Sequence, residues 1–188
     1  SHLKVLGTSD SAAGDPVRHL EELITAQGLT ADLLLSPGDL GDKASSDGIK
    51  YAWKCLQEIG IQLNAHLVAA SSGNHDLDSR YLGFSSDPTE TLQRLVPPYP
   101  LPDDADNDRY WAKKFVVKTT ENYRLAILNS SAYHGGKPEE IAHGRISNFT
   151  IERLGKELGD TFPVPPINIL LCHHNPHQFQ EILQEDDT

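Results

Sequence analysis

The segment HLVAASSGNHD, residues 66–76, decides the fold. Its first five residues form a short apolar run that predicts a buried strand. Gly73, Asn74, His75 and Asp76 follow almost at once. A turn needs the glycine and accepts the asparagine, but it does not need a histidine followed by an aspartate. We therefore predict that this strand ends at a binding or catalytic site.

The residues before this segment alternate between strand and helix patterns. Residues 3–6 and 32–36 are short apolar runs that predict strands. Residues 15–28 predict a helix, because they begin with Asp-Pro and end with glycine. Residues 45–60 predict a second helix with apolar side chains at the 3.6-residue period, again ending at a glycine. Repeated strand–helix–strand units predict an α/β fold with a parallel sheet.

The residues after this segment have a more irregular pattern. Residues 97–108, PPYPLPDDADND, are rich in proline and acid and predict a surface loop. Residues 110–118 and 123–129 flank TTEN and predict an antiparallel hairpin. A helix capped near Ser147 follows, and residues 167–172 predict a strand that stops at HHNPH.

Length, charge and cysteine content limit the class of protein. The 188 residues suffice for one core, and we expect residues 1–188 to be a single domain of a longer chain. The net charge of −11 leaves nucleic acid open as a partner but does not favour it. No apolar run could span a bilayer, so we expect no membrane partner. Cys55 and Cys172 lack metal-site spacing and indicate free thiols in a reducing compartment, which predicts a cytoplasmic protein.

Polar residues follow four of the predicted strands. Asp10 follows the first, Asp39 the second, Asn74 the third and His173 the last. Alone, an aspartate can stabilise a turn, and a single histidine is more often a core residue. Together they converge, because ligands of open α/β sheets bind at the carboxyl ends of strands. Such oxygen and nitrogen donors suit divalent metals such as manganese, iron or zinc.

These motifs resemble the signature of the calcineurin-like metallophosphoesterases. The family has Asp-x-His, then Gly-Asp, then Gly-Asn-His-Asp/Glu, then a histidine after a strand, and last Gly-His-x-His. This chain has Asp10, GDLGD at 38–42, GNHD at 73–76 and LLCHH at 170–174. The resemblance extends from Leu3 to about Pro176. It implies a two-sheet β-sandwich flanked by helices on both faces, with its closing strands missing from these residues.

The resemblance also implies a dinuclear centre that hydrolyses a phosphate mono- or diester. Asp39 would bridge two divalent ions (manganese, iron, zinc or magnesium), because a carboxylate between two cations offsets their repulsion. Asp10 would bind the first ion, and Asn74 and His173 would bind the second. The implied substrate is a phosphate ester.

Neighbouring residues receive other roles from the same resemblance. His75 would contact the phosphate or protonate the leaving oxygen, and Asp76 would hold its ring in orientation. His174 is the alternative to its neighbour as metal ligand, because adjacent histidines leave the register open. Apart from the resemblance, His134 and His143 lie in predicted loops and are interpreted as exposed polar residues.

Two departures from the family pattern support a second hypothesis. Ala12 stands where the family has a metal-binding histidine, and no Gly-His-x-His follows His173 within the 188 residues. The chain is therefore expected to be either a phosphoesterase or a catalytically impaired relative used for regulation or partner binding. A nuclease is a third and weaker hypothesis, because the acidic charge opposes DNA contacts.

Overall fold

The computed structural model describes residues 15–77, 87–134, 144–160 and 162–175. Within these residues the chain is a mixed α/β protein with two small sheets. Its helices are α1 (Pro16–Gln27), α2 (Ser46–Gln62), α3 (Pro88–Gln93), α4 (Asp104–Lys113) and α5 (Asn148–Gly159). Its strands are β1 (Leu33–Ser36), β2 (Leu67–Ala70), β3 (Phe115–Thr119), β4 (Tyr123–Leu128) and β5 (Ile167–Leu171). The predicted strand at residues 3–6, together with Asp10, Ala12 and His143, lies outside the described residues.

The strands form two separate sheets. In the first, β1 and β2 pair in parallel, with Leu33 opposite Leu67. In the second, β4 lies in the centre and pairs antiparallel with β3 and parallel with β5. The predicted parallel pair and the predicted hairpin turn around TTEN are therefore confirmed.

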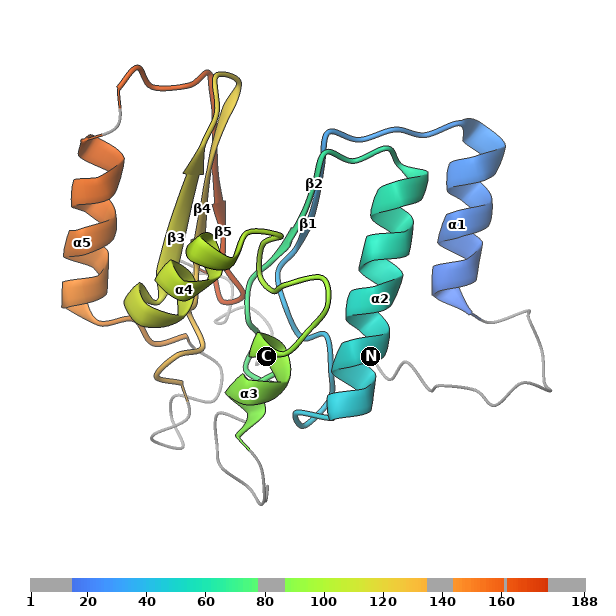
Figure 1. The fold of residues 1–188 in the computed structure, drawn as a ribbon, viewed down its shortest axis with the longest axis horizontal. Helices are drawn as coiled ribbons and strands as arrows, with labels where there is room; N and C mark the ends of the chain where they lie inside the picture. The colour runs from blue at the N-terminus through green and yellow to red at the C-terminus, as the bar shows by residue number, and fades with distance from the viewer. Residues whose placement is uncertain (1–14, 78–86, 135–143, 161, 176–188) are drawn as a thin grey trace, which may run out of the picture.

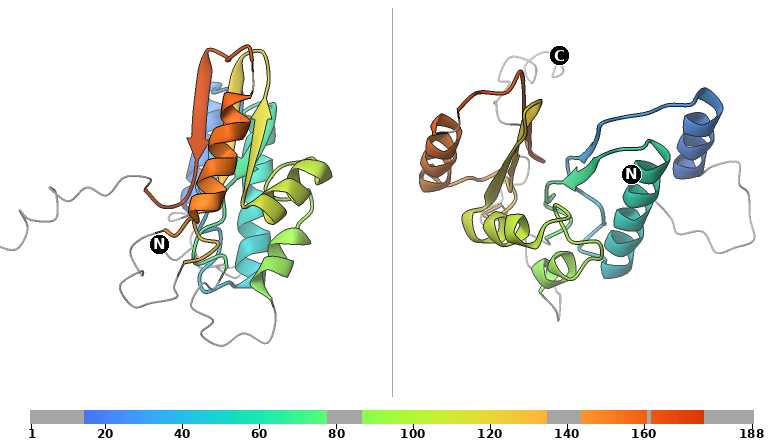
Figure 2. Two further views of the ribbon diagram at one scale, coloured as in Figure 1. Left: turned by 90° about the vertical axis from the view of Figure 1, so that its left-hand side faces the viewer. Right: turned by 45° about the horizontal axis from the view of Figure 1, so that its top comes forward.

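The two sheets lie between helices (Figure 1). Helix α5 covers the outer side of the three-stranded sheet, α2 covers the outer side of the two-stranded sheet, and α1 lies beyond α2; the tilted view on the right of Figure 2 shows the same order. One buried cluster joins the sheets, because it contains Trp53 of α2, Ala69 of β2 and Ile127 of β4. A smaller cluster around Phe115 and Leu154 lies under α5.

Local sequence signals fix both ends of α1 and the start of α5. The Asp15 side chain accepts a hydrogen bond from the Val17 N–H, and Gly28 ends the helix in the left-handed conformation at φ 59°. Ser147 caps α5 by accepting from the Thr150 N–H. Both helices begin where the sequence predicts. No helix within the described ranges combines the length and apolar character needed to cross a bilayer.

The predicted end of α2 at Gly60 is wrong. The helix continues to Gln62, and Gly60 is buried within it. A Cβ atom at position 60 would overlap the Val68 side chain of β2. The glycine therefore lets the helix approach the sheet closely instead of ending the helix.

The predicted surface loop at residues 97–108 is correct only in part, because residues 97–103 are neither helix nor strand but several of them are buried. Tyr99 and Leu101 are core residues, 1% and 0% exposed. The acidic run begins α4, with Asp103 as its N-cap, because carboxylates are favoured at helix N-termini. The helix extends to Lys113, so the first part of the predicted hairpin strand is helical.

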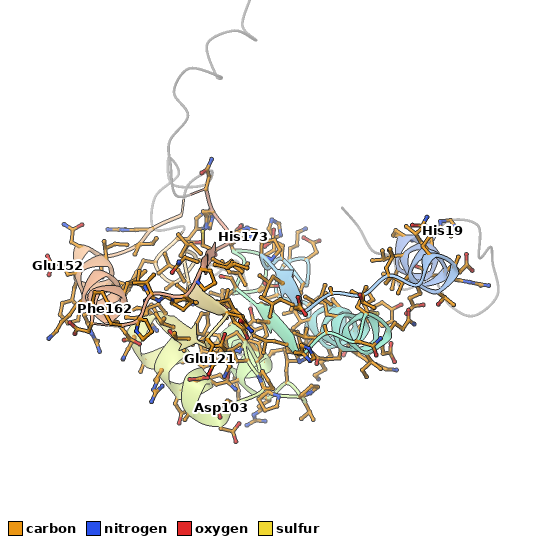
Figure 3. The ribbon with its side chains drawn as sticks, turned by 90° about the horizontal axis from the view of Figure 1, so that it is seen from above. His19, Asp103, Glu121, Glu152, Phe162 and His173 are labelled. Atoms are coloured by element: carbon orange, nitrogen blue, oxygen red, sulfur yellow. The ribbon has the colours of Figure 1, made fainter. Side chains whose placement is uncertain are left out.

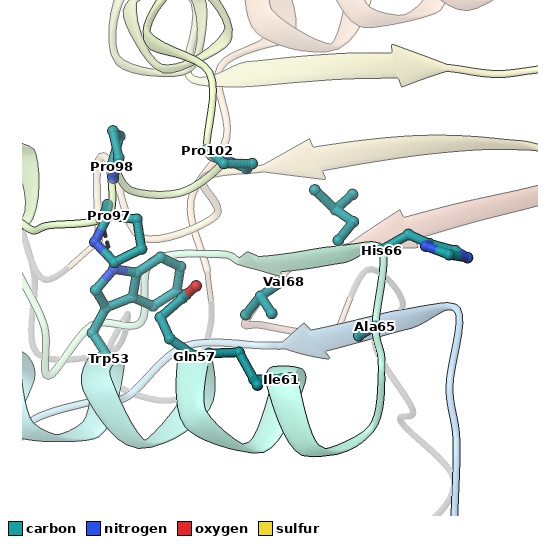
Figure 4. A pocket seen from close by; sticks show the side chains of 11 residues that line it. Trp53, Gln57, Ile61, Ala65, His66, Val68, Pro97, Pro98 and Pro102 are labelled. Carbon is teal, nitrogen blue, oxygen red and sulfur yellow. Dashed lines mark hydrogen bonds between the residues drawn. The ribbon is translucent and has the colours of Figure 1, made fainter.

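A hollow lies beside the start of β2, at the opposite end of this strand from Asn74. It is lined by α2, residues 65–68 and the proline-rich segment 97–102, and the Trp53 indole N–H donates to the Pro97 carbonyl at 2.7 Å (Figure 4). Residues 65–68 enter β2, whereas Asn74 follows its other end. The hollow is therefore no part of the predicted site.

Candidate functional site

The loops after β1 and β2 pack directly against each other. Gly38, at φ 103°, has no room for a side chain, because a Cβ atom there would lie 2.5 Å from the Gly73 nitrogen. A Cβ atom on Gly73 would in turn overlap the Asp39 carboxylate. Asp39 itself has a left-handed backbone, with φ 57°. The glycines of the GDLGD and GNHD motifs therefore allow contact between the two backbones.

The buried side chain of Asp76 joins these two loops by hydrogen bonds. Its carboxylate is fully buried and accepts hydrogen bonds from the N–H groups of Asp39, Gly41 and Gly73, each at 2.9 Å. Burial raises the pKa of Asp76 to about 6, and the N–H donors oppose that rise. The expectation that this carboxylate orients the His75 ring is corrected, because both of its oxygens are used by backbone donors.

The carboxylate that contacts the His75 ring belongs to Asp42. His75 Nδ1 lies 3.1 Å from Asp42 Oδ1, and both side chains are about half exposed. The His75 backbone is held as well, since its N–H donates to Asp39 Oδ1 at 3.1 Å and its carbonyl accepts from the Ala44 N–H. The sequence showed this aspartate only as a second acid in GDLGD. Its partner depends on the local path of residues 42–44.

Three of the four predicted metal ligands lie together. His173 Nε2 is 3.0 Å from Asn74 Oδ1 and 3.5 Å from Asp39 Oδ1. Asp39 follows the end of β1, Asn74 the end of β2 and His173 the end of β5. Figure 3 shows His173 near the middle of the molecule. The fourth predicted ligand, Asp10, lies outside the described residues.

The His173 ring faces hydrogen-bond acceptors on both sides. Its Nδ1 lies 3.1 Å from the Pro37 carbonyl oxygen, while Nε2 faces the oxygens of Asn74 and Asp39. A neutral imidazole has one N–H, so one nitrogen would direct a lone pair at oxygen. Turning the Asn74 amide over would give Nε2 a donor, but the carboxylate of Asp39 would still face it. Either a second ring proton or a cation beside Nε2 removes the conflict.

The donor set fits one divalent ion. Two donors bound to an ion at about 2.1 Å lie roughly 3.0 Å apart in octahedral and roughly 3.4 Å apart in tetrahedral geometry. The observed separations, 3.0 and 3.5 Å, agree with these values. Metal-binding histidines commonly direct their other ring nitrogen at a backbone carbonyl, as His173 Nδ1 does at Pro37. Because one donor is an amide, no group of three His, Cys, Asp or Glu side chains forms a metal site within the described residues.

His174 faces a different environment from its neighbour. Its Nδ1 lies 3.0 Å from Ser130 Oγ, and its ring stacks on His134 with the centroids 4.9 Å apart. Of the two adjacent histidines, His173 is therefore the one beside Asp39. His134 is only 4% exposed, so its interpretation as an exposed loop residue is wrong.

Comparison with known proteins adds no further assignment. A scan of the sequence against models of protein families finds no match, and a search of curated proteins finds no significantly similar sequence. The functional interpretation therefore rests on the residues and their geometry.

Proposed function

We propose that this protein is a metal-dependent phosphoesterase that hydrolyses a phosphate mono- or diester at a centre of two divalent ions. One observation carries the proposal: the His173 ring presents Nε2 to the oxygens of Asn74 and Asp39 at 3.0 and 3.5 Å while its Nδ1 faces a carbonyl. A cation at this point would relieve the conflict between the acceptors. Manganese, iron, zinc and magnesium all fit a mixed oxygen and nitrogen donor set to some degree.

The residues would divide the metal ligands as follows. Asp39, Asn74 and His173 would hold one ion, and Asp39 with Asp10 would hold the other, as the resemblance to the metallophosphoesterases implies. When bound, such ions polarise a phosphoryl oxygen and activate water. Asp39 would reach both ions because its backbone is fixed by the buried carboxylate of Asp76, leaving its own carboxylate partly exposed.

His75 would act on the substrate instead of on the metal. Its ring is half exposed, and Nδ1 is occupied by Asp42, so Nε2 remains to meet a phosphate or the leaving oxygen. The Asp42 carboxylate would hold the ring so that Nε2 can approach the phosphate or the leaving oxygen. Asp42 is thus a positioning residue in this proposal.

The architecture is proposed to be the β-sandwich that the resemblance implies. Two sheets that share a buried cluster between α2 and α5 support it. The closing strands of such a sandwich would pair with β5, which is an edge strand of its sheet in the described part of the chain.

An assay of turnover tests the proposed function. The chain is incubated with a chromogenic phosphodiester and a phosphomonoester, with manganese and after chelation. We expect metal-stimulated hydrolysis that Asp39→Asn and His75→Ala abolish. Asp32→Asn and His66→Ala serve as matched controls, because both side chains are exposed and lie before the same two strands. Hydrolysis that ignores metal, or survives Asp39→Asn, would contradict the proposal.

A catalytically impaired relative is the second candidate, because Ala12 removes a ligand that the family pattern supplies. Calorimetry with manganese separates the two. Stoichiometric binding that Asp39→Asn removes, without turnover of either substrate, would favour the regulatory or partner-binding function.

A further inference from the structure

The end of β4 forms a buried polar segment that bonds both to the loop that carries Asn74 and to the loop that carries His173. Residues 128–131, Leu-Asn-Ser-Ser (the LNSS segment), are each at most 3% exposed. None of the hydrogen bonds that the segment makes within the described residues goes to Asn74 or His173. Its partners include Ser71 and Ser72, which precede Asn74, and His174, which follows His173.

Toward β2, the LNSS segment makes two hydrogen bonds. The Ser71 hydroxyl donates to the Leu128 carbonyl at 2.9 Å, and the Ser131 hydroxyl donates to the Ser72 carbonyl at 3.0 Å. All four residues are buried. Asn74 follows two residues after Ser72, so these bonds fix the start of its loop.

Toward β5, the same segment holds the backbone beside His173. The His174 N–H donates to Ser130 Oγ at 3.0 Å, and the His174 ring nitrogen Nδ1 lies 3.0 Å from the same oxygen. The ring is also confined by Gly144, where a Cβ atom would lie 2.7 Å from it. Ser130 therefore fixes both the backbone and the ring of the residue after His173.

Such bonds matter because the site spans two sheets. Asn74 follows a strand of the β1–β2 sheet and His173 follows a strand of the β3–β4–β5 sheet, and no ladder of backbone hydrogen bonds joins the two sheets in the described part of the chain. The apolar cluster between them packs without directional preference. The hydroxyl bonds of Ser71 and Ser131 cross from one sheet to the other and are directional.

We propose that the LNSS segment is a positioning element that sets how closely Asn74 approaches His173, and thereby sets the affinity of the site for a divalent ion. The inference about affinity rests on the proposed function; the inference about the approach does not. Ser130 and Ser131 are the two positioning residues, one for each half of the site.

Serine-to-alanine variants test the proposal in the full chain. Ser130→Ala and Ser131→Ala are compared with Ser147→Ala, which removes a serine hydroxyl that caps α5 and so costs stability away from the site. Two quantities are measured: manganese affinity by calorimetry, and the ring NMR signals of His173 in the metal-free protein. We expect each LNSS variant to lose about tenfold in manganese affinity and to shift the His173 signals. Ser147→Ala should change neither.

The outcomes separate the two proposals. Unchanged His173 signals and affinity in both LNSS variants would overturn the positioning role, as would equal losses in Ser147→Ala. If the wild-type chain binds no manganese, the phosphoesterase proposal fails, while the His173 signals still decide the positioning role. Should either variant not fold, Ser71→Ala removes one hydroxyl bond to the segment and is expected to shift the same signals.

Discussion

Asp39 and Asn74 lie on loops that follow neighbouring strands of one sheet, whereas His173 follows a strand of the other sheet. The first two loops are joined by three backbone N–H bonds to the Asp76 carboxylate. The third is joined to them through the LNSS segment, by the hydroxyls of Ser71 and Ser131, and by the contacts of the His173 ring. The first half of the site, Asp39 and Asn74, is therefore built into one parallel sheet. The position of the second half, His173, depends on how the two sheets are held together.

Removing the buried carboxylate should have the largest effect on the first half. Asp76→Ala leaves three backbone N–H groups without an acceptor, and each costs about 1–3 kcal/mol. We expect the free energy of unfolding to fall by about 4 kcal/mol, measured by urea denaturation. Exposed Asp32→Ala should change it by less than about 0.5 kcal/mol. Similar midpoints for the two variants would show that Asp76 does not hold the loops.

A methyl group between the two loops should have the next largest effect. In Gly73→Ala the new Cβ atom would overlap the carboxylate and backbone of Asp39, so the loops must separate, at about 2–3 kcal/mol. Thermal and urea unfolding measure this loss. The control, Gly155→Ala, introduces a Cβ atom into open space within α5 and should stabilise the chain by about 0.5–1 kcal/mol. Equal effects of the two substitutions would break the argument for close loop contact.

Much of the first half of the site could be predicted from the sequence. Adjacent strands of a parallel sheet place their carboxyl ends side by side, so Asp39 and Asn74 were expected to meet. His173 was found by the same rule, since its strand ends at the same edge of the molecule. The choice between His173 and His174 could not be made, because it depends on which face of the backbone meets Ser130.

Other features depend on tertiary contacts that local patterns do not encode. The proline-rich and acidic composition of residues 97–108 is typical of a loop, yet Tyr99 and Leu101 belong to the apolar core cluster. Gly60 has the pattern of a helix end, but its role is set by Val68 on a different element. The pairing of Asp42 with His75 depends on left-handed backbone at Lys43 and Ala44, which no sequence signal announced.

The His75–Asp42 pair offers a prediction about chemistry instead of stability. Asp42→Asn keeps a side chain of the same size but replaces the carboxylate that holds the His75 ring by a neutral and weaker hydrogen-bonding partner. We expect phosphoester turnover to fall by about tenfold, with manganese stoichiometry unchanged, because Asp42 is no ligand in the proposed site. Steady-state kinetics with a chromogenic diester measures the fall, and Asp32→Asn is the matched control. Turnover at the wild-type rate would remove Asp42 from the mechanism.

The smallest expected effect concerns a hydroxyl that fixes the loop of Asn74 from the side of α4. Tyr110 is fully buried, and its hydroxyl oxygen accepts from the Ser72 N–H at 3.0 Å and lies 2.9 Å from Ser72 Oγ. Burial raises the pKa of Tyr110 to about 12, so the hydroxyl stays protonated at neutral pH. Tyr110→Phe keeps the ring packing and leaves one N–H without its acceptor, which should cost about 1 kcal/mol in the free energy of unfolding.

Tyr133→Phe provides the matched control, because that residue is 46% exposed and removal of an exposed hydroxyl should change stability little. Hydrogen exchange of the Ser72 amide sharpens the result, since loss of its acceptor should speed exchange at this amide more than at residues of α5. If the exchange rate does not change, Tyr110 does not hold the loop of Asn74, and that loop depends on Asp76, the parallel sheet and the LNSS segment. The first half of the site would then also depend on contacts between the two sheets.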